Sequence, residues 1–379
     1  ARRTGTGTGN AAATLNLGDG VAAGVATTAI GSVTMAVNTS SGGAVSANFN
    51  ITGGDVTIGT GSGTAINMAN AGAGRSVDAN IDLSGGNVTV SGNIIRTGGA
   101  GTENATVILN GSHLDMSGNS IGSSVSPILL SAQSGSLTNL AGLNSGGTLT
   151  KSSPDILTLG NGNTFTGGVN VAEGTLLANN TTGSATGSGT VSVDAGTILG
   201  GDGIIAPGAD ELIIVDGDLI VGLPTAVAGS DLALTTSGSG STMLNGKVGF
   251  DIFSGAGAGD NTLDLSAADR LILSGPVTLG GSLSITDPNS LTAWTDGDKW
   301  KLFDWALSGA PTGEFSNLMG LPTVGNFADL PDLSPTLAWD VSDLYVGGTI
   351  SVVTVPEPGR LLLLMMGLLG MIRRRRRRC

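Results

Sequence analysis

Two stretches in the middle of the chain carry the same pattern: "GGVNVAEGTLLANN" at residues 167–180 and "GTVSVDAGTILGGD" at residues 189–202. The shift between them is 22 residues, 189 minus 167. In each, valines alternate with polar residues, which is the two-residue period of a half-buried strand. Gly174 and Gly196 follow, where the chain must turn tightly. A looser third copy spans residues 213–219, so the pattern predicts short strands joined at glycine corners.

The same strand and corner pattern recurs elsewhere. It is found in "NVTVSGNII" from Asn87, "ATVILNGSHLDM" from Ala105 and "PVTLGGSLSI" from Pro276. A period of roughly 20 to 25 residues predicts a right-handed parallel β-helix (solenoid), in which each coil buries its aliphatic face against the next. An antiparallel β-sandwich is the alternative, because it also combines short strands with frequent turns.

The composition favours a folded, repetitive chain. Glycine supplies 65 of 379 residues, yet 40% of the residues are hydrophobic, so a buried interior is possible. Aromatic residues are only 3%, so we expect a thin core built from aliphatic layers.

The charge of the chain is unevenly distributed. Seven of the sixteen basic residues lie among the last twenty positions, and before Pro356 there are 9 basic and 28 acidic residues, a net charge of -19. A body this acidic repels phosphate backbones, which argues against nucleic-acid binding. The only cysteine is Cys379, so no disulfide within the chain and no thiol metal site is possible, and we expect no cofactor.

Residues 146–180 resemble the autotransporter-associated β-strand repeat, except at "SSPD", where that family more often has a glycine-containing turn. The resemblance implies a β-helical stalk of a surface-exposed protein. The matching segments are Thr150-Lys151, Leu157-Thr158-Leu159, Asn163-Thr164-Phe165-Thr166-Gly167-Gly168 and Gly174-Thr175-Leu176.

The chain divides into three predicted parts. Residues 1–239 are predicted to form the β-solenoid, and residues 240–354, which hold all four tryptophans, the terminal coils and a β-rich cap. Residues 355–379 are predicted to be a third, separate segment. The chain starts "ARRTG" with no apolar run of signal-peptide length, so we expect a signal peptide in a segment upstream.

The last segment reads "VPEPGRLLLLMMGLLGMIRRRRRRC", residues 355–379. Its apolar run, Leu361 to Ile372, is predicted to form a short hydrophobic helix of roughly 18 Å, against a hydrocarbon core of about 30 Å. A basic cluster beside such a helix stays on the cytoplasmic side. The cluster consists of Arg373, Arg374, Arg375, Arg376, Arg377 and Arg378.

The order of Pro356-Glu357-Pro358, apolar helix and arginine cluster resembles the PEP-CTERM sorting signal of Gram-negative bacteria. The resemblance implies export, transient anchoring in the inner membrane, processing by an exosortase-type enzyme near Pro-Glu-Pro, and release to the cell surface or extracellular matrix. A permanent C-terminal tail anchor is the alternative.

Few residues have the chemistry of an active site. His113 is the only histidine and has no evident partner, so a turn residue in water is the favoured interpretation. Asp194, Asp216 and Asp218 could meet on one edge of stacked coils and bind calcium, but solvated turn aspartates are favoured. Trp294 and Trp300 could form a sugar-stacking platform, although burial in the cap is more common.

Together these features predict a non-enzymatic, secreted structural or adhesive β-solenoid that is sorted to the bacterial envelope, in the setting of an extracellular matrix or biofilm with polysaccharide as a partner. The alternatives are a polysaccharide-binding or polysaccharide-degrading β-helix and an adhesin similar to an autotransporter passenger. A true passenger would need a C-terminal membrane barrel, whereas this chain ends in the apolar run and arginines.

Overall fold

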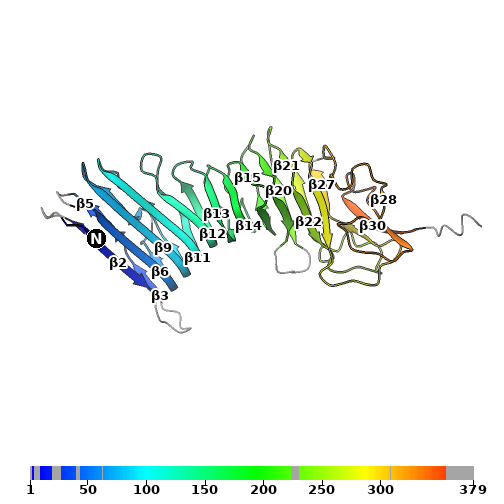
Figure 1. Ribbon diagram of the computed structural model, residues 1–379, viewed down its shortest axis with the longest axis horizontal. Coiled ribbons are helices and arrows are strands. Elements are labelled where there is room, and N and C mark those ends of the chain that lie inside the picture. Colours follow the sequence, from blue (N-terminus) through cyan, green and yellow to red (C-terminus); the bar gives the residue numbers. More distant parts are fainter. Residues whose placement is uncertain are drawn as a thin grey trace, which may run out of the picture.

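The computed structural model describes residues 2–3, 9–18, 27–39, 43–61, 63–222, 230–307 and 309–355. Within these residues the protein is entirely β, with thirty strands and no helix. Figure 1 shows an elongated molecule in which the strands lie side by side along the long axis, from β2 near the N-terminus to β28 and β30 at the other end. The predicted helix Leu361 to Ile372 lies outside the described residues.

Most strands pair in parallel with a strand of the next coil, as a β-helix requires and a β-sandwich does not. The first row of stacked strands runs the length of the rod. It comprises β2 (Ala11–Leu17), β6 (Val45–Ile58), β9 (Ser76–Val90), β11 (Thr102–Ile121), β12 (Leu129–Leu143), β13 (Leu149–Gly160), β14 (Val169–Asn179), β15 (Val191–Val193), β18 (Ile213–Val215), β21 (Thr242–Leu244) and β24 (Val277–Leu279).

A second row follows the first corner of each coil. The long strands β6, β9 and β11 to β14 continue into it, and the other members are β3 (Thr27–Ile30), β16 (Ile198–Gly201), β19 (Asp218–Val221), β22 (Lys247–Asp251) and β25 (Ser282–Thr286).

Shorter strands complete the coils. In the first coils these are β1 (Arg2–Arg3), β4 (Val33–Thr34), β5 (Val37–Asn38), β7 (Thr64–Asn67), β8 (Asn70–Ala71) and β10 (Asn93–Ile95). In the later coils a parallel sheet consists of β17 (Ile204–Ile205), β20 (Asp231–Thr235), β23 (Arg270–Ser274) and β27 (Phe303–Leu307).

The predicted internal repeat is confirmed up to its corner. Val169 pairs with Val191 in the parallel ladder of β14 and β15, so the two copies are consecutive coils. Gly174 has φ of +71° and Gly196 has φ of +84°. Side chains other than glycine rarely adopt this left-handed backbone, which explains why glycine stands at both corners.

Beyond the corner the sequence alignment is wrong by one residue. It pairs Leu176 with Ile198, whereas in the structure Leu176 lies opposite Leu199. The reason is that residues 172–174 form the first corner and residues 194–197 form the second, which is one residue longer. Leu176 and Leu199 are both fully buried, and Ile198 is half-buried, so the core position sets the register.

The core is a column of aliphatic side chains, and buried asparagines join the coils at its corners. Asn163 is 2% exposed. Its Oδ1 accepts a hydrogen bond from Leu140 N at 2.8 Å, and its Nδ2 donates to Ala185 O at 2.7 Å. Its side chain therefore satisfies backbone groups of the preceding and the following coil, which would otherwise be buried without partners.

A four-stranded antiparallel sheet lies at the C-terminal end of the rod, where the cap was predicted (Figure 1). Its order is β26 (Lys299–Lys301), β30 (Thr349–Thr354), β29 (Leu337–Asp340) and β28 (Val324–Gly325). We call residues 287–302 and 309–355 the cap. The parallel coils continue past residue 239: the chain enters the cap after β25, returns to the coils in β27 and then completes the cap.

Candidate functional site

The chain leaves the cap from an inner strand. β30 is hydrogen-bonded on one side to β26 and on the other to β29. At its end, Thr354 N donates to Asp296 Oδ1 at 2.8 Å, and Val355 N donates to Thr336 O at 2.8 Å. The last described residues are therefore held on the folded body, immediately before the Pro-Glu-Pro sequence.

Three tryptophans pack together in the cap. The ring centroid of Trp294 lies 5.4 Å from that of Trp300 and 5.4 Å from that of Trp339. The Trp300 and Trp339 side chains are 0% exposed, and Trp294 is half-buried. The suggested sugar platform of Trp294 and Trp300 is therefore wrong, because Trp300 is wholly inside the cap.

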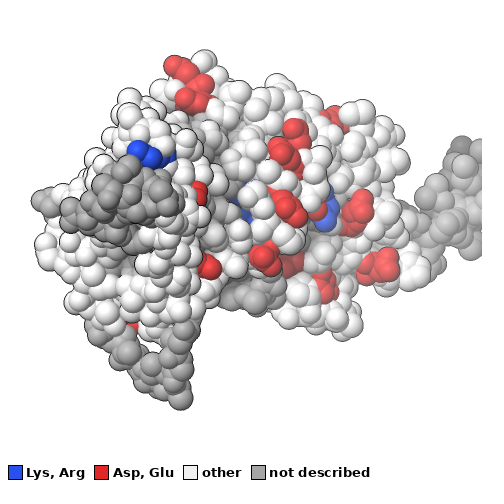
Figure 2. Space-filling model, turned by 60° about the vertical axis from the view of Figure 1, so that its left-hand side comes forward, with Lys and Arg blue, Asp and Glu red and all other residues white. Residues whose placement is uncertain are grey.

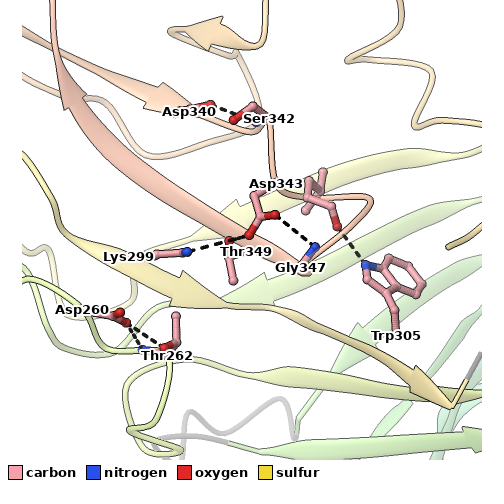
Figure 3. Close-up of polar contacts among 10 residues, drawn as sticks. Asp260, Thr262, Lys299, Trp305, Asp340, Ser342, Asp343, Gly347 and Thr349 are labelled. Atoms are coloured by element: carbon pink, nitrogen blue, oxygen red, sulfur yellow. Dashed lines mark hydrogen bonds and ion pairs between the residues drawn. The ribbon is translucent and has the colours of Figure 1, made fainter. Parts of the chain in front are cut away.

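The turn that leads into β30 is fixed by polar contacts (Figure 3). The Asp343 carboxylate accepts a hydrogen bond from Thr349 Oγ1 at 2.6 Å and lies 3.7 Å from Lys299 Nζ. Trp305 lies in β27, in the neighbouring coil, and its Nε1 donates a hydrogen bond to Leu344 O at 2.8 Å. These contacts tie the strand that carries the C-terminal segment to both the cap and the last coil.

Asp298 is a buried carboxylate whose hydrogen bonds come from backbone and hydroxyl groups. It is 0% exposed. Its oxygens accept from Gly257 N at 2.8 Å, Gly259 N at 2.9 Å and Thr295 N at 2.7 Å. These donors take the place of water around the charge, so Asp298 holds the 255–259 loop against the cap.

Asp269 is a second buried carboxylate, beside two other aspartates. It is 1% exposed and accepts hydrogen bonds from Ser230 N at 2.9 Å and Asp251 N at 3.1 Å. Burial raises the pKa of Asp269 to about 7, with the nearby carboxylates of Asp251 and Asp231 adding to the rise and the two N–H donors opposing it.

Lys151 lies inside the solenoid. Its side chain is 0% exposed, and Nζ donates to Ser153 O, to Ser153 Oγ at 3.1 Å and to Glu173 O at 3.2 Å. Burial lowers the pKa of Lys151, while the nearby Asp155 and Glu173 charges partly offset that effect. The lysine of the repeat-like motif is thus a structural link between two consecutive corners.

The three calcium candidates do not share one cluster of carboxylates. Asp194 and Asp216 are exposed; Asp216 Oδ1 accepts from Asn245 Nδ2 at 2.7 Å, and Asp218 Oδ2 lies 3.1 Å from Lys247 Nζ. In the part of the chain that the structure describes, no three His, Cys, Asp or Glu side chains are placed to hold a metal ion. Calcium binding at these residues stays the untested alternative to the favoured interpretation, solvated turn aspartates.

His113 lies within strand β11, just after the corner at Gly111, and is half-buried. Its Nδ1 is 2.6 Å from Ser136 Oγ on the next coil. This contact belongs to a line of polar side chains on the second row, in which Asn87 Nδ2 also donates to Asp55 Oδ1 at 2.8 Å. The environment of His113 is that of a link between coils.

The acidic residues are concentrated in the C-terminal half. Residues 1–193 hold eight acidic and five basic residues, whereas residues 194–355 hold twenty acidic and four basic residues, a net charge of -16. Figure 2 shows acidic side chains scattered over the right-hand part of this face with few basic ones among them. Neither the buried acids Asp269 and Asp298 nor the buried Lys151 was recognised from sequence. The two aspartates lie outside the strands, where no period shows which side chains face the core. Lys151 lies in β13, two residues after the buried Leu149, so the two-residue period of the strand was a signal for its inward position.

The fold defines a class: a parallel β-solenoid with an antiparallel C-terminal cap, from which the chain continues into a terminal segment. Residues 354–378 match the model of the PEP-CTERM protein-sorting motif. This signal implies export and sorting by an exosortase. The match begins at Thr354, the last residue of β30, so the matched segment follows directly on the inner strand of the cap.

A search of curated proteins gives no match. The sorting residues Pro356, Glu357 and Pro358, the apolar run and the arginine cluster lie outside the described residues. Among the described residues, no helix has the length and apolarity needed to cross a bilayer.

Proposed function

We propose that this protein is a non-enzymatic, structural or adhesive rod of the bacterial surface or extracellular matrix. The sorting signal at residues 354–378 supports the export of the protein. The observation that supports a mechanical role is the stacked core, which continues from the first coils to the cap. The side chains outside it offer hydrated polar groups to a matrix.

The polar surface supports this role because neighbouring coils are linked outside as well as inside. Asn50 Nδ2 donates to Asn16 Oδ1 at 2.8 Å, and Asn104 Nδ2 donates to Asp78 Oδ1 at 2.7 Å. Such ladders stiffen the face of a parallel sheet while keeping it soluble. We further propose a right-handed coil, as is the rule for parallel β connections, and a relationship to the autotransporter-associated repeat through residues 146–180.

For the tail we propose that Leu361 to Ile372 holds the protein in the inner membrane until an exosortase-type enzyme cleaves near Pro356-Glu357-Pro358. The position of β30 is compatible with cleavage after folding, because the hydrogen bonds described for Thr354 and Val355 lie before Pro356 and removal of the tail would leave them intact.

The test is to fractionate the Gram-negative host and measure the intact mass of the protein in each fraction. We expect the extracellular form to lack the residues after about 357, and deletion of the gene to weaken the matrix. Recovery of the whole chain, arginines included, in the membrane fraction would falsify the proposed sorting. Release of oligosaccharides from matrix glycans by the purified protein would refute a non-enzymatic role.

A further inference from the structure

A groove lies where the last coil meets the cap. It is a shallow groove, open to solvent, with a volume of about 430 Å³. One wall is the end of β25 with Ser284 and Thr286, continuing to Asp287, and the other wall is the segment 328–331, which carries Asp329. Buried Ile285 and Leu330 form the apolar part of the lining.

The two walls are fixed to each other. Ile285 N donates to Asp329 O at 2.8 Å. Asn317 Nδ2 donates to both Leu283 O and Asp329 Oδ2, each at 2.8 Å, while Leu283 N donates to Asn317 Oδ1 at 3.0 Å. Trp339 Nε1 donates to Pro331 O at 2.8 Å, tying the second wall to the tryptophan cluster. The groove therefore needs little ordering when a ligand binds.

The groove is acidic and no basic side chain lines it. Asp287 and Asp329 are part of the lining, and Asp251 borders it through its hydrogen bond from Thr286 Oγ1. The four basic residues of this half already lie within ion-pair distance of carboxylates elsewhere. These pairs are Lys247 with Asp218, Arg270 with Asp231, Lys299 with Asp343 and Lys301 with Asp304. The complementary ligand is therefore a cation, and the hydroxyl of Ser284 beside the carboxylates favours one that also carries hydroxyl groups.

We propose that this groove binds an amino-sugar unit of a matrix polysaccharide, with the sugar ammonium group at Asp329 and its hydroxyl groups at Ser284 and Asp287. The inference rests on the proposed matrix function and gives that rod a specific attachment point beside the cap. The net charge of -16 on residues 194–355 should repel anionic polysaccharides from this end.

Isothermal titration of the complete chain with a glucosamine tetramer tests the site, with the N-acetylglucosamine tetramer and tetralysine as comparisons. Asp329→Asn removes the charge but keeps an oxygen that can accept from Asn317. Asp202→Asn, at an exposed residue outside the groove, is the matched control. We expect Asp329→Asn to weaken binding about tenfold, Asp202→Asn to leave it unchanged, and added salt to weaken the native protein more than Asp329→Asn.

A Ser284→Ala variant provides a second measurement, with an expected loss of about threefold and an unaltered tryptophan near-ultraviolet spectrum. The proposal is overturned if the glucosamine tetramer does not bind, if both aspartate variants weaken it equally, or if the acetylated tetramer or tetralysine binds as tightly. The Asp329→Asn variant should also be followed in the host. If it is exported and retained in the matrix like the native protein, the groove is not the attachment point, but the proposed rod function is unaffected. Failure of the groove proposal can thus be distinguished from failure of the proposed function.

Discussion

The first coils and the middle coils build the same core with different strands. β6, β9 and β11 are 14, 15 and 20 residues long, whereas β15 and β18 have 3 residues each and β16 and β19 have 4. The long strands bend through corners such as Gly53-Gly54 and Gly85-Gly86, where the pairing shifts register. The middle strands stop at turns with aspartate and glycine. In both regions buried aliphatic residues face inward, so the core is independent of how the corners are made.

The surfaces of the two regions differ more than their interiors. The early coils are joined by neutral or singly charged amide ladders, such as Asn48 with Asn80. The later coils carry most of the carboxylates. Substitutions in the core should therefore lower the free energy of unfolding by similar amounts in both regions. Changes of pH and salt should alter the stability mainly of the later coils.

The largest effect is expected where the C-terminal end is closed. Trp339→Ala removes a fully buried ring that packs against Trp294 and Trp300, and should lower the free energy of unfolding by about 3 to 5 kcal/mol. Urea denaturation measures the loss, and limited proteolysis should show early cleavage in the cap while the first coils persist. Val346→Ala, at a side chain 78% exposed, is the control. A loss below about 1 kcal/mol for Trp339→Ala would show that the cap is not coupled to the coils.

The two repeat corners give a matched pair. Both glycines have positive φ, but a Cβ on Gly174 would lie 2.2 Å from Ser153 O, whereas one on Gly196 would meet nothing within 4 Å. Gly196→Ala should therefore cost about 1 kcal/mol from backbone strain alone, and Gly174→Ala about 3 kcal/mol because the corner must also shift. Thermal and urea unfolding of both variants measure the difference. Equal losses would contradict the close approach of coils at Gly174.

The pH dependence of stability should reveal Asp269. Its folded pKa of about 7 lies above the ordinary value of 3.8, so the folded state holds the proton more tightly. Stability from this group is complete below about pH 4 and is lost as the pH rises through 7. From pH 5 to 8 we expect the free energy of unfolding to fall by on the order of 2 kcal/mol, and Asp269→Asn to flatten that slope. Urea titrations at each pH test this, with Asp202→Asn as the control; parallel slopes in all three proteins would disprove it.

The smallest effects should separate amide ladders from ion pairs. Asn50→Ala removes the bond to Asn16 and should cost about 0.5 kcal/mol, both at low salt and in 1 M sodium chloride. Lys247→Met removes the partly exposed pair with Asp218 and should cost at most about 0.5 kcal/mol at low salt and nothing at high salt. If salt changes the stability loss of the two variants equally, the surfaces of the two regions do not differ in their electrostatic contribution to stability.

The sequence predicts the repeated part of this fold well, and the unique part less well. Alternating valines and the glycines at 174 and 196 were sufficient to find the strands, the corners and the parallel stacking. They could not give the register after the corner, because one extra residue in a turn does not change the hydrophobic pattern. The core position of Leu199 decides it.

The cap depends on contacts between residues far apart in the chain. Thr354 N reaches Asp296, and Trp300 Nε1 donates to Ser254 O at 2.9 Å. No local period signals such pairs, so the sequence indicated a β-rich region with tryptophans but neither its antiparallel order nor the adjoining groove. The C-terminal signal was recognisable for the opposite reason: its parts follow one another in order along the chain.

The inner position of β30 also decides how the body resists being pulled. A force applied through the C-terminal end acts along the axis of this strand, perpendicular to its hydrogen bonds with β26 and β29. The load is therefore shared by hydrogen bonds on both sides, and the strand must slide past two neighbours at once. An edge strand that is pulled away sideways would instead lose its hydrogen bonds one at a time. Before the proposed cleavage, while the tail would still hold the rod in the membrane, the body should therefore resist a pull along β30 better than a pull across it.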